Sequence, residues 1–165
     1  MSREWQEKFE KDFTFMKRDD RDYVQNSYYK WGIECSSGWE KVIREFCEAV
    51  VKRYAEDGIA EADIDIIPRQ IKEKMGTLRI DYTYPESKEI DEKTKKLRED
   101  IAKIAEQAEE QSKTVCELCG APGSFWDDRK VGVFWVRTLC EPCRDRLIGA
   151  AVDAKKKKKQ NRDDQ

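Results

Sequence analysis

Six cysteines and the absence of histidine decide what chemistry this 165-residue sequence can perform. Four of the cysteines form two close pairs, each with a two-residue gap, and 20 residues separate the pairs. These four are Cys116, Cys119, Cys140 and Cys143. Zinc binds four thiolates at the corners of a tetrahedron, and a two-residue gap lets one tight turn present two of them. The spacing therefore predicts a four-cysteine zinc ribbon, in which zinc is structural because four thiolates leave no open coordination position.

The other two cysteines offer little chemistry. Cys47 falls on the apolar stripe of a predicted helix, and we interpret it as a buried structural thiol. Cys35 lies in an aromatic segment, where no histidine is available to activate it as a nucleophile. The lack of histidine also excludes Ser-His and Cys-His pairs. We predict no catalytic residue, and a hydrolase that uses Asp or Glu with a second metal ranks lowest because no carboxylates cluster in a motif.

Residues 63–84 are rich in Ile, Thr and Tyr, which predicts a β-hairpin that turns at Met75-Gly76. Placing these two residues at the centre of the turn fixes the pairs on each face of the hairpin. The pairs are Glu73–Leu78, Ile71–Ile80, Arg69–Tyr82 and Ile67–Tyr84 on one face, and Lys74–Thr77, Lys72–Arg79 and Gln70–Asp81 on the other. A bulge would shift this register, since Met tolerates a positive φ poorly.

Basic residues gather on the predicted hairpin and are candidates for ligand binding. Lys72 would lie opposite Arg79 with Lys74 beside them, an arrangement that fits either a solvated face or a site for a phosphate or carboxylate. Arg69 would project among apolar and tyrosine side chains, including Tyr82. An unpaired guanidinium there is costly, so Arg69 should stack on a tyrosine, pair with a carboxylate or reach a ligand.

Aromatic residues and a lysine run supply the remaining candidates. Trp31 and Trp39 belong to an aromatic segment with glycines, which we expect to be a packed loop. Their rings could line the core or could stack against a base or a partner's side chain. Lys155 to Lys159 are five consecutive lysines. Such a run attracts nucleic acid or other polyanions without sequence preference, or serves only solubility.

Amphipathic periodicity predicts three helices, at about residues 3–16, 39–57 and 94–108, that must position these groups. We therefore predict an α+β fold in which helices pack on the β-hairpin and a four-cysteine zinc ribbon follows at the C-terminal end. The predicted units are residues 1–30 (a charged N-terminal helix and linker), 31–113 (the α+β domain), 114–153 (the zinc ribbon and a short helix) and 154–165 (a disordered lysine-rich tail). The stripe of Trp5, Phe9 and Phe13 on the first helix could join the core or form a homodimer.

Composition limits where the protein can act. Charged residues make up 41% of the chain, and no stretch approaches the roughly 20 apolar residues that span a bilayer. The first residues lack the apolar run of a secretory signal, so we predict a cytoplasmic protein without membrane contact, and a disulfide role for the cysteines is disfavoured.

Charge is distributed unevenly along the chain. Residues 1–113 carry 22 basic and 27 acidic residues, whereas residues 114–165 carry 11 basic and 8 acidic residues. The C-terminal part is the better candidate for contact with an anion.

Three blocks of the sequence together resemble a family of small, mostly uncharacterised proteins encoded by bacteriophages, prophages and bacteria. The blocks are Trp31 to Cys35 with Gly38-Trp39, Gln70 to Arg79, and Cys116 to Gly123 with Trp135 to Cys140 and Cys143. The chain departs from the family in its longer charged N-terminal helix and its lysine tail. The resemblance implies a phage setting, and hence the cytoplasm of a host cell, but it brings no established activity.

The sequence as a whole favours a non-catalytic zinc-ribbon protein that binds and modulates a host protein or nucleic-acid complex, for example in host defence or transcription. Zinc ribbons present rigid surfaces at little ordering cost, which suits recognition. The alternative is a sponge that sequesters a nucleotide-like anionic signal. In that hypothesis the basic hairpin residues bind phosphates, while Trp or Tyr stacks on the base.

Overall fold

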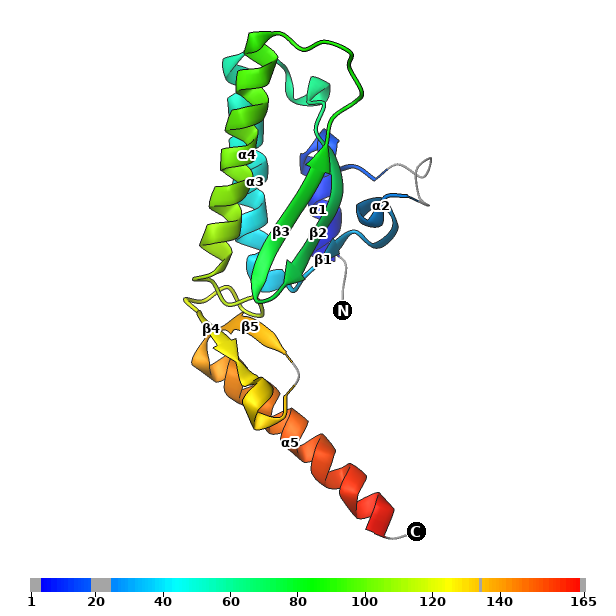
Figure 1. The fold of residues 1–165 in the computed structure, drawn as a ribbon, viewed down its shortest axis with the longest axis vertical. Coiled ribbons are helices and arrows are strands. Elements are labelled where there is room, and N and C mark those ends of the chain that lie inside the picture. Colours follow the sequence, from blue (N-terminus) through cyan, green and yellow to red (C-terminus); the bar gives the residue numbers. More distant parts are fainter. Residues whose placement is uncertain (1–3, 19–24, 134, 164–165) are drawn as a thin grey trace.

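The computed structural model describes residues 4–18, 25–133 and 135–163 and has the predicted α+β fold. A sheet of three strands and four helices form a body, and a two-stranded ribbon followed by a long helix extends from one end of it (Figure 1). The elements of the body are α1 (Glu4–Asp12), α2 (Ser27–Trp31), β1 (Ile33–Glu34), α3 (Glu40–Glu56), β2 (Ile67–Lys74), β3 (Thr77–Thr83) and α4 (Glu92–Ser112). Those of the ribbon are β4 (Ser124–Asp127), β5 (Val136–Leu139) and α5 (Glu141–Asp163). Short 3-10 turns occur at Thr14–Met16, Ser37–Trp39, Glu61–Asp63 and Asp128–Val131.

The hairpin of β2 and β3 forms with the predicted turn. Met75 and Gly76 both have positive φ, 53° and 79°, as a two-residue hairpin turn requires. The Gly76 amide donates to the Glu73 carboxylate across 2.7 Å, which helps to hold methionine in this unusual conformation. The five predicted pairs nearest the turn, from Lys74–Thr77 to Gln70–Asp81, are confirmed.

The far end of the hairpin differs from the prediction. A bulge between Pro68 and Gln70 pairs Pro68 with Tyr82 and Ile67 with Thr83, so the predicted pairs Arg69–Tyr82 and Ile67–Tyr84 are wrong. Proline has no amide proton to give to a ladder, which favours a bulge at this position. The carbonyl of Pro68 instead accepts a hydrogen bond from the Asn26 side chain.

Strand β1 and helix α4 cover the two edges of this hairpin. β1 pairs in parallel with β2, so the segment predicted as a loop contains α2 and a short strand. On the other edge, the amide of Leu78 donates to Ser112 Oγ and the amide of Ile80 donates to the Glu109 carboxylate, at 2.9 and 3.0 Å. Side chains of α4 thus take the place of a fourth strand along β3.

One hydrophobic core joins the N-terminal residues to the rest of the body. Phe9 and Phe13 are buried with side chains of α3, the hairpin and α4, and Trp5 packs against them. The described residues of the segment 1–30 therefore contribute side chains to the core of the body. Phe9 and Phe13 of the aromatic stripe are covered within the chain, whereas Trp5 is half-buried. The helix ends at Asp12, and Phe15 and Met16 enter the core from a 3-10 turn.

The C-terminal helix is longer than expected. The sequence predicts a short helix to about residue 152 and a disordered tail over residues 154–165, whereas α5 continues to Asp163. Alanine and lysine both favour helix, which explains why a segment whose only apolar residue is Ala154 can continue a helix that begins at the ribbon. The ammonium of Lys155 also contacts the carbonyl of Gly132. Among the described residues, no helix is both long enough and apolar enough to cross a membrane.

Candidate metal centre and its seam with the body

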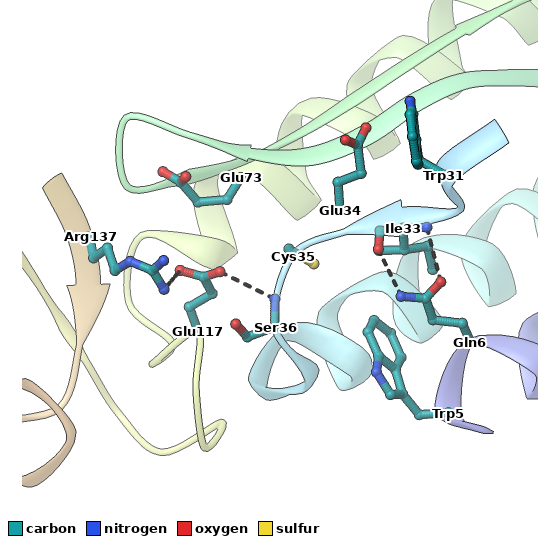
Figure 2. Close-up of a pocket in the computed structure, with 10 residues that line it drawn as sticks. All are labelled: Trp5, Gln6, Trp31, Ile33, Glu34, Cys35, Ser36, Glu73, Glu117 and Arg137. Carbon is teal, nitrogen blue, oxygen red and sulfur yellow. Dashed lines mark hydrogen bonds and ion pairs between the residues drawn. The ribbon is translucent and has the colours of Figure 1, made fainter. Parts of the chain in front are cut away.

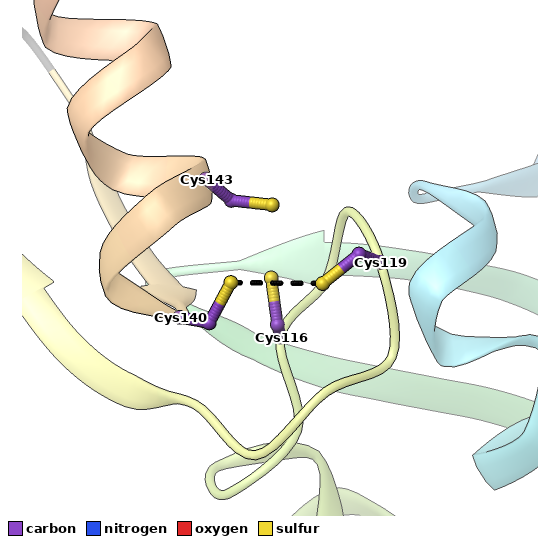
Figure 3. A group of neighbouring side chains, drawn as sticks. All are labelled: Cys116, Cys119, Cys140 and Cys143. Carbon is purple, nitrogen blue, oxygen red and sulfur yellow. Dashed lines mark hydrogen bonds between the residues drawn. The ribbon is translucent and has the colours of Figure 1, made fainter.

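The four predicted ligands meet at one point between β5, α5 and a tight turn (Figure 3). Their sulfur atoms all lie within 4.8 Å of one another, and the Cys119 and Cys140 sulfurs are 3.6 Å apart. A tetrahedron with zinc–sulfur bonds of about 2.3 Å has edges of about 3.8 Å, so this donor set fits zinc closely. All six cysteines are free thiols, which agrees with metal binding rather than disulfides.

Local backbone geometry explains why these thiols converge. After Cys116 the chain turns back at Gly120, whose φ is 77° and whose amide donates to the Cys116 carbonyl across 2.9 Å. The amide of Cys116 in turn donates to the Ala121 carbonyl at 2.7 Å. Cys140 follows the end of β5 and Cys143 lies in the first turn of α5, so a strand end and a helix start supply the second pair.

The electrostatics of the cluster favour a bound cation. Although burial opposes it, hydrogen bonds from the backbone around Cys140, Cys119 and Leu118 lower the pKa of Cys116 to about 7. Burial, together with hydrogen bonds to the neighbouring thiols, raises the pKa of Cys143 to about 12. A divalent metal would displace this proton, because a thiol that coordinates a metal is deprotonated. Arg146 adds a positive charge from outside, with its guanidinium 2.9 Å from the Cys143 sulfur.

Glu117, between the first two cysteines, ties the ribbon to the body (Figure 2). Its side chain is only 3% exposed, and its two carboxylate oxygens accept from the guanidinium of Arg137 and from the amide of Ser36, each at 3.2 Å. Its backbone carbonyl accepts from the Gly38 amide at 2.8 Å. Burial raises the pKa of Glu117, while Arg137 opposes the shift. We call this junction of Ser36–Trp39 and the hairpin turn with the ribbon the seam.

Three further contacts make the seam tight. A Cβ atom at Gly38 would lie 2.3 Å from the carbonyl oxygens of Cys116 and Glu117, so only glycine fits there. The indole N–H of Trp39 donates to the Val115 carbonyl at 2.8 Å. The hydroxyl of Thr138 donates to the carbonyl of Gly76 at the hairpin turn, at 2.6 Å. The three sequence blocks singled out above therefore meet at one place in the fold.

The predicted basic cluster on the hairpin forms only in part. Lys72 is paired with Arg79 as expected, but the Arg79 guanidinium lies 3.1 Å from the Glu109 carboxylate of α4. Lys74 is exposed beside the turn. The bulge changes the pairing of Arg69, and its guanidinium donates to the Gln25 carbonyl at 3.3 Å. We predicted a tyrosine ring or a carboxylate as the partner of Arg69. Among the described residues, its hydrogen-bond partner is instead this backbone carbonyl.

The predicted aromatic candidates have three different environments. Trp39 is fully buried and belongs to the core. Tyr82 is half-buried and packs edge-on against Tyr84, and the guanidinium that lies over Tyr84 is that of Arg98, 4.2 Å from the ring centroid. Trp31 is 51% exposed and remains available to a ligand.

The two cysteines outside the metal cluster are not suited to act as nucleophiles. Burial raises the pKa of both Cys35 and Cys47 well above the usual thiol range, so both are neutral and unreactive near pH 7.

Two cavities, of about 470 and 590 Å³, are each lined by several carboxylates. The four basic residues of the hairpin that we predicted as ligand-binding candidates line neither cavity. This arrangement does not favour the nucleotide sponge.

Glu117 and Arg137 were not among the functional residues predicted from the sequence. Both lie within the ribbon, where the cysteine spacing was the only feature interpreted, and their role depends on contacts with residues far away in the chain. The charged side chain of Glu117 between two metal ligands was the one feature of the sequence that pointed to such a role.

The comparisons with known proteins identify no relative: no known family, no curated protein and no solved structure matches this chain.

Proposed function

We propose that this protein is a non-catalytic zinc-binding protein that binds nucleic acid through the basic end of α5. The supporting observation is that Lys155 to Lys159 are all exposed on a helix that extends away from the body (Figure 1). A nucleic-acid phosphate backbone is a polyanion that attracts such a row of ammonium groups without sequence preference. The structural metal centre, with four thiolates and no open position, gives no reason to expect catalysis there.

Helix geometry determines what kind of binding these lysines support. Successive residues of an α-helix are about 100° apart and rise about 1.5 Å, so five consecutive lysines point in all directions over less than two turns. Such an arrangement can contact phosphates on both walls of a groove but presents no single face for reading bases. Binding should therefore depend strongly on salt and little on sequence.

The basic end of α5, residues 153–160, has no apolar face that would suit a membrane or a protein groove. From Asp153 to Gln160 every side chain is exposed, and the only apolar one is Ala154. Amphipathic helices that bind membranes or protein grooves need a stripe of large apolar residues. Purely electrostatic contact with a polyanion is the interaction that this composition supports.

The metal centre would orient α5 and the lysines at its end. Cys140 and Cys143 hold its first turn, and Arg144 adds a bidentate ion pair to the buried Asp128, at 2.7 to 3.2 Å, while lying 4.0 Å from the ring centroid of Trp126. These contacts fix the start of α5 on the ribbon, which the seam in turn fixes on the body. From the resemblance of the three sequence blocks, we further infer a phage setting in which the target is a host nucleic acid or its protein complex.

The test compares two variants that lose the same charge. In the first, all five lysines from 155 to 159 become Gln; in the second, five exposed lysines elsewhere (Lys8, Lys11, Lys41, Lys52 and Lys88) become Gln. Fluorescence anisotropy with a labelled duplex DNA and a labelled RNA, measured over a range of salt, should show tight binding by wild type and by the second variant, and much weaker binding by the first variant. If all five lysines contact duplex phosphates, the slope of log K against log salt should be smaller by about 4 to 5 in the first variant.

Two results would contradict this proposal. One is the absence of salt-dependent binding by wild type. The other is an equal loss of affinity in both variants, which would mean that net charge alone, and not α5, determines binding.

A further inference from the structure

A cavity of about 470 Å³ opens at the seam, and its lining is acidic and aromatic, in contrast to the basic end of α5 (Figure 2). Its size lies in the range that holds small ligands or a single long side chain. Its lining includes Trp5, Trp31, Glu34, Glu73, Glu117 and Arg137. They come from α1, α2, β1, the hairpin and the ribbon, so the cavity is complete only when the ribbon is docked on the body.

Two indole rings form part of the cavity wall. Trp31 is half-exposed, which is unusual for so large an apolar side chain, and Trp5 is half-buried against Phe9, with ring centroids 6.0 Å apart. Indole is the best partner of a cation among the aromatic side chains. Trp31 already has this role, since the ammonium of Lys30 lies 4.9 Å from its ring centroid.

The carboxylates in the lining outnumber the cations. Glu117 is neutralised by Arg137, as described above. Glu34 and Glu73, by contrast, receive the hydrogen bonds that the described residues show from neutral donors, the Gln70 amide at 3.4 Å and the Gly76 backbone amide at 2.7 Å. Two further negative charges thus line the cavity, with Glu34 beside Trp31 and Glu73 nearer to Arg137 (Figure 2).

We propose that this cavity is a binding site for a guanidinium group, which pairs with Glu34, stacks against Trp31 or Trp5 and is attracted by the further negative charge of Glu73. A guanidinium is planar and always charged, donates hydrogen bonds in a fork that matches carboxylates, and stacks on aromatic faces. An ammonium has no plane to stack, and a phosphate would be repelled by the two carboxylates. The inference goes beyond nucleic-acid binding, because it concerns a separate site with the opposite charge.

The probe is arginine with both ends capped, N-acetylarginine methylamide, titrated into the zinc-loaded full chain. The chain has five tryptophans, so their indole N–H signals in a ¹H–¹⁵N spectrum report where the probe binds. Trp5→Phe and Trp31→Phe assign the two relevant signals. We expect those two signals to shift in a saturable way. Capped citrulline, in which a neutral urea replaces the guanidinium, should bind at least about tenfold more weakly.

Matched variants locate the charge. Glu34→Gln and Glu73→Gln keep a hydrogen-bond acceptor for Gln70 and Gly76, so the hairpin should stay intact, while each should weaken binding by about tenfold. Glu86→Gln, at the other cavity, is the control and should bind the probe as wild type does. Zinc content by native mass spectrometry and the dispersion of the spectrum confirm that each variant is folded.

Each result of these titrations tests a different part of the proposal. An absence of saturable shifts, equal binding of capped citrulline, or unchanged affinity in both carboxylate variants would overturn the site. Equal binding of capped lysine would overturn the choice of guanidinium. Agmatine distinguishes the source of the group: tighter binding of agmatine supports a free small molecule, whereas tighter binding of capped arginine supports an arginine of a protein partner.

Discussion

The body and the ribbon are stabilised by different interactions. The body buries a continuous set of apolar side chains from its helices and hairpin, with Ile43, Ile71 and Ile101 completely inaccessible. The apolar cluster of the ribbon has only Leu139 besides two of the metal-binding cysteines among its buried members. Burial of apolar surface therefore stabilises the body, whereas the ribbon depends on its metal and on the seam.

Removing the metal should produce the largest effect and should fall on one region only. Structural zinc binding supplies about 10 to 16 kcal/mol in small zinc modules at pH 7, more than the buried apolar side chains of Val133, Val136 and Leu139 can replace. We expect a chelator, or Cys116→Ser, to collapse the dispersion of the ribbon's ¹H–¹⁵N signals while the signals of the body persist. Cys47→Ala removes a buried thiol from the body and is the control, since it should keep one zinc per chain in native mass spectrometry. Collapse of both regions together would show that the body has no independent stability.

Gly38→Ala tests the seam from the side of the body. The added methyl group would meet two backbone carbonyl oxygens at 2.3 Å, and neither can move without displacing the turn that carries Cys116. We expect a loss of about 3 kcal/mol in the free energy of unfolding, measured by denaturant titration. Gly149→Ala on α5 is the matched control, because nothing lies within 4 Å of its added methyl group. That control should gain about 0.5 to 1 kcal/mol of helix stability, and a loss as large as that of Gly38→Ala would argue against a special role for the seam.

Removing one cation from an ion pair should have the smallest effect, and its size should depend on where the pair lies. Arg137→Gln leaves the carboxylate of Glu117, which is 3% exposed, without its cation, so we expect a loss of about 1 to 2 kcal/mol. Arg79→Gln removes the partner of Glu109 on the surface and should change stability by less than about 1 kcal/mol. Thermal unfolding of both variants at two salt concentrations would compare them. Equal losses would mean that burial at the seam adds nothing to the pair.

Local patterns in the sequence were enough to predict the elements and the metal ligands. Periodicity located α3 and α4 to within a few residues, and the cysteine spacing identified the four thiols that converge, because each of these signals lies within a short stretch of chain. The turn at Met75-Gly76 likewise fixed the register of the nearest pairs. Pro68 could have warned of the bulge, since it cannot donate to the ladder.

The seam and its cavity could not be predicted in this way. The bond from the Ser36 amide to Glu117 joins residues 81 positions apart, and no periodicity or spacing relates them. The indole rings of Trp5 and Trp31 likewise come from helices whose relative placement depends on the whole core. Residues that a cavity or a junction brings together are set by packing, and a single sequence carries little trace of it.

The way in which α4 covers β3 has a consequence for the newly made chain on the ribosome. An open strand edge can pair with another chain, and here the edge is closed only when Ser112 and Glu109 dock onto it. Roughly 30 residues separate the hairpin from these two side chains, so at about 5 to 20 residues per second the edge stays open for about 2 to 6 s of translation. During that interval the nascent hairpin is exposed to pairing with its neighbours on the same messenger, and a chaperone that shields it would raise the yield of folded protein.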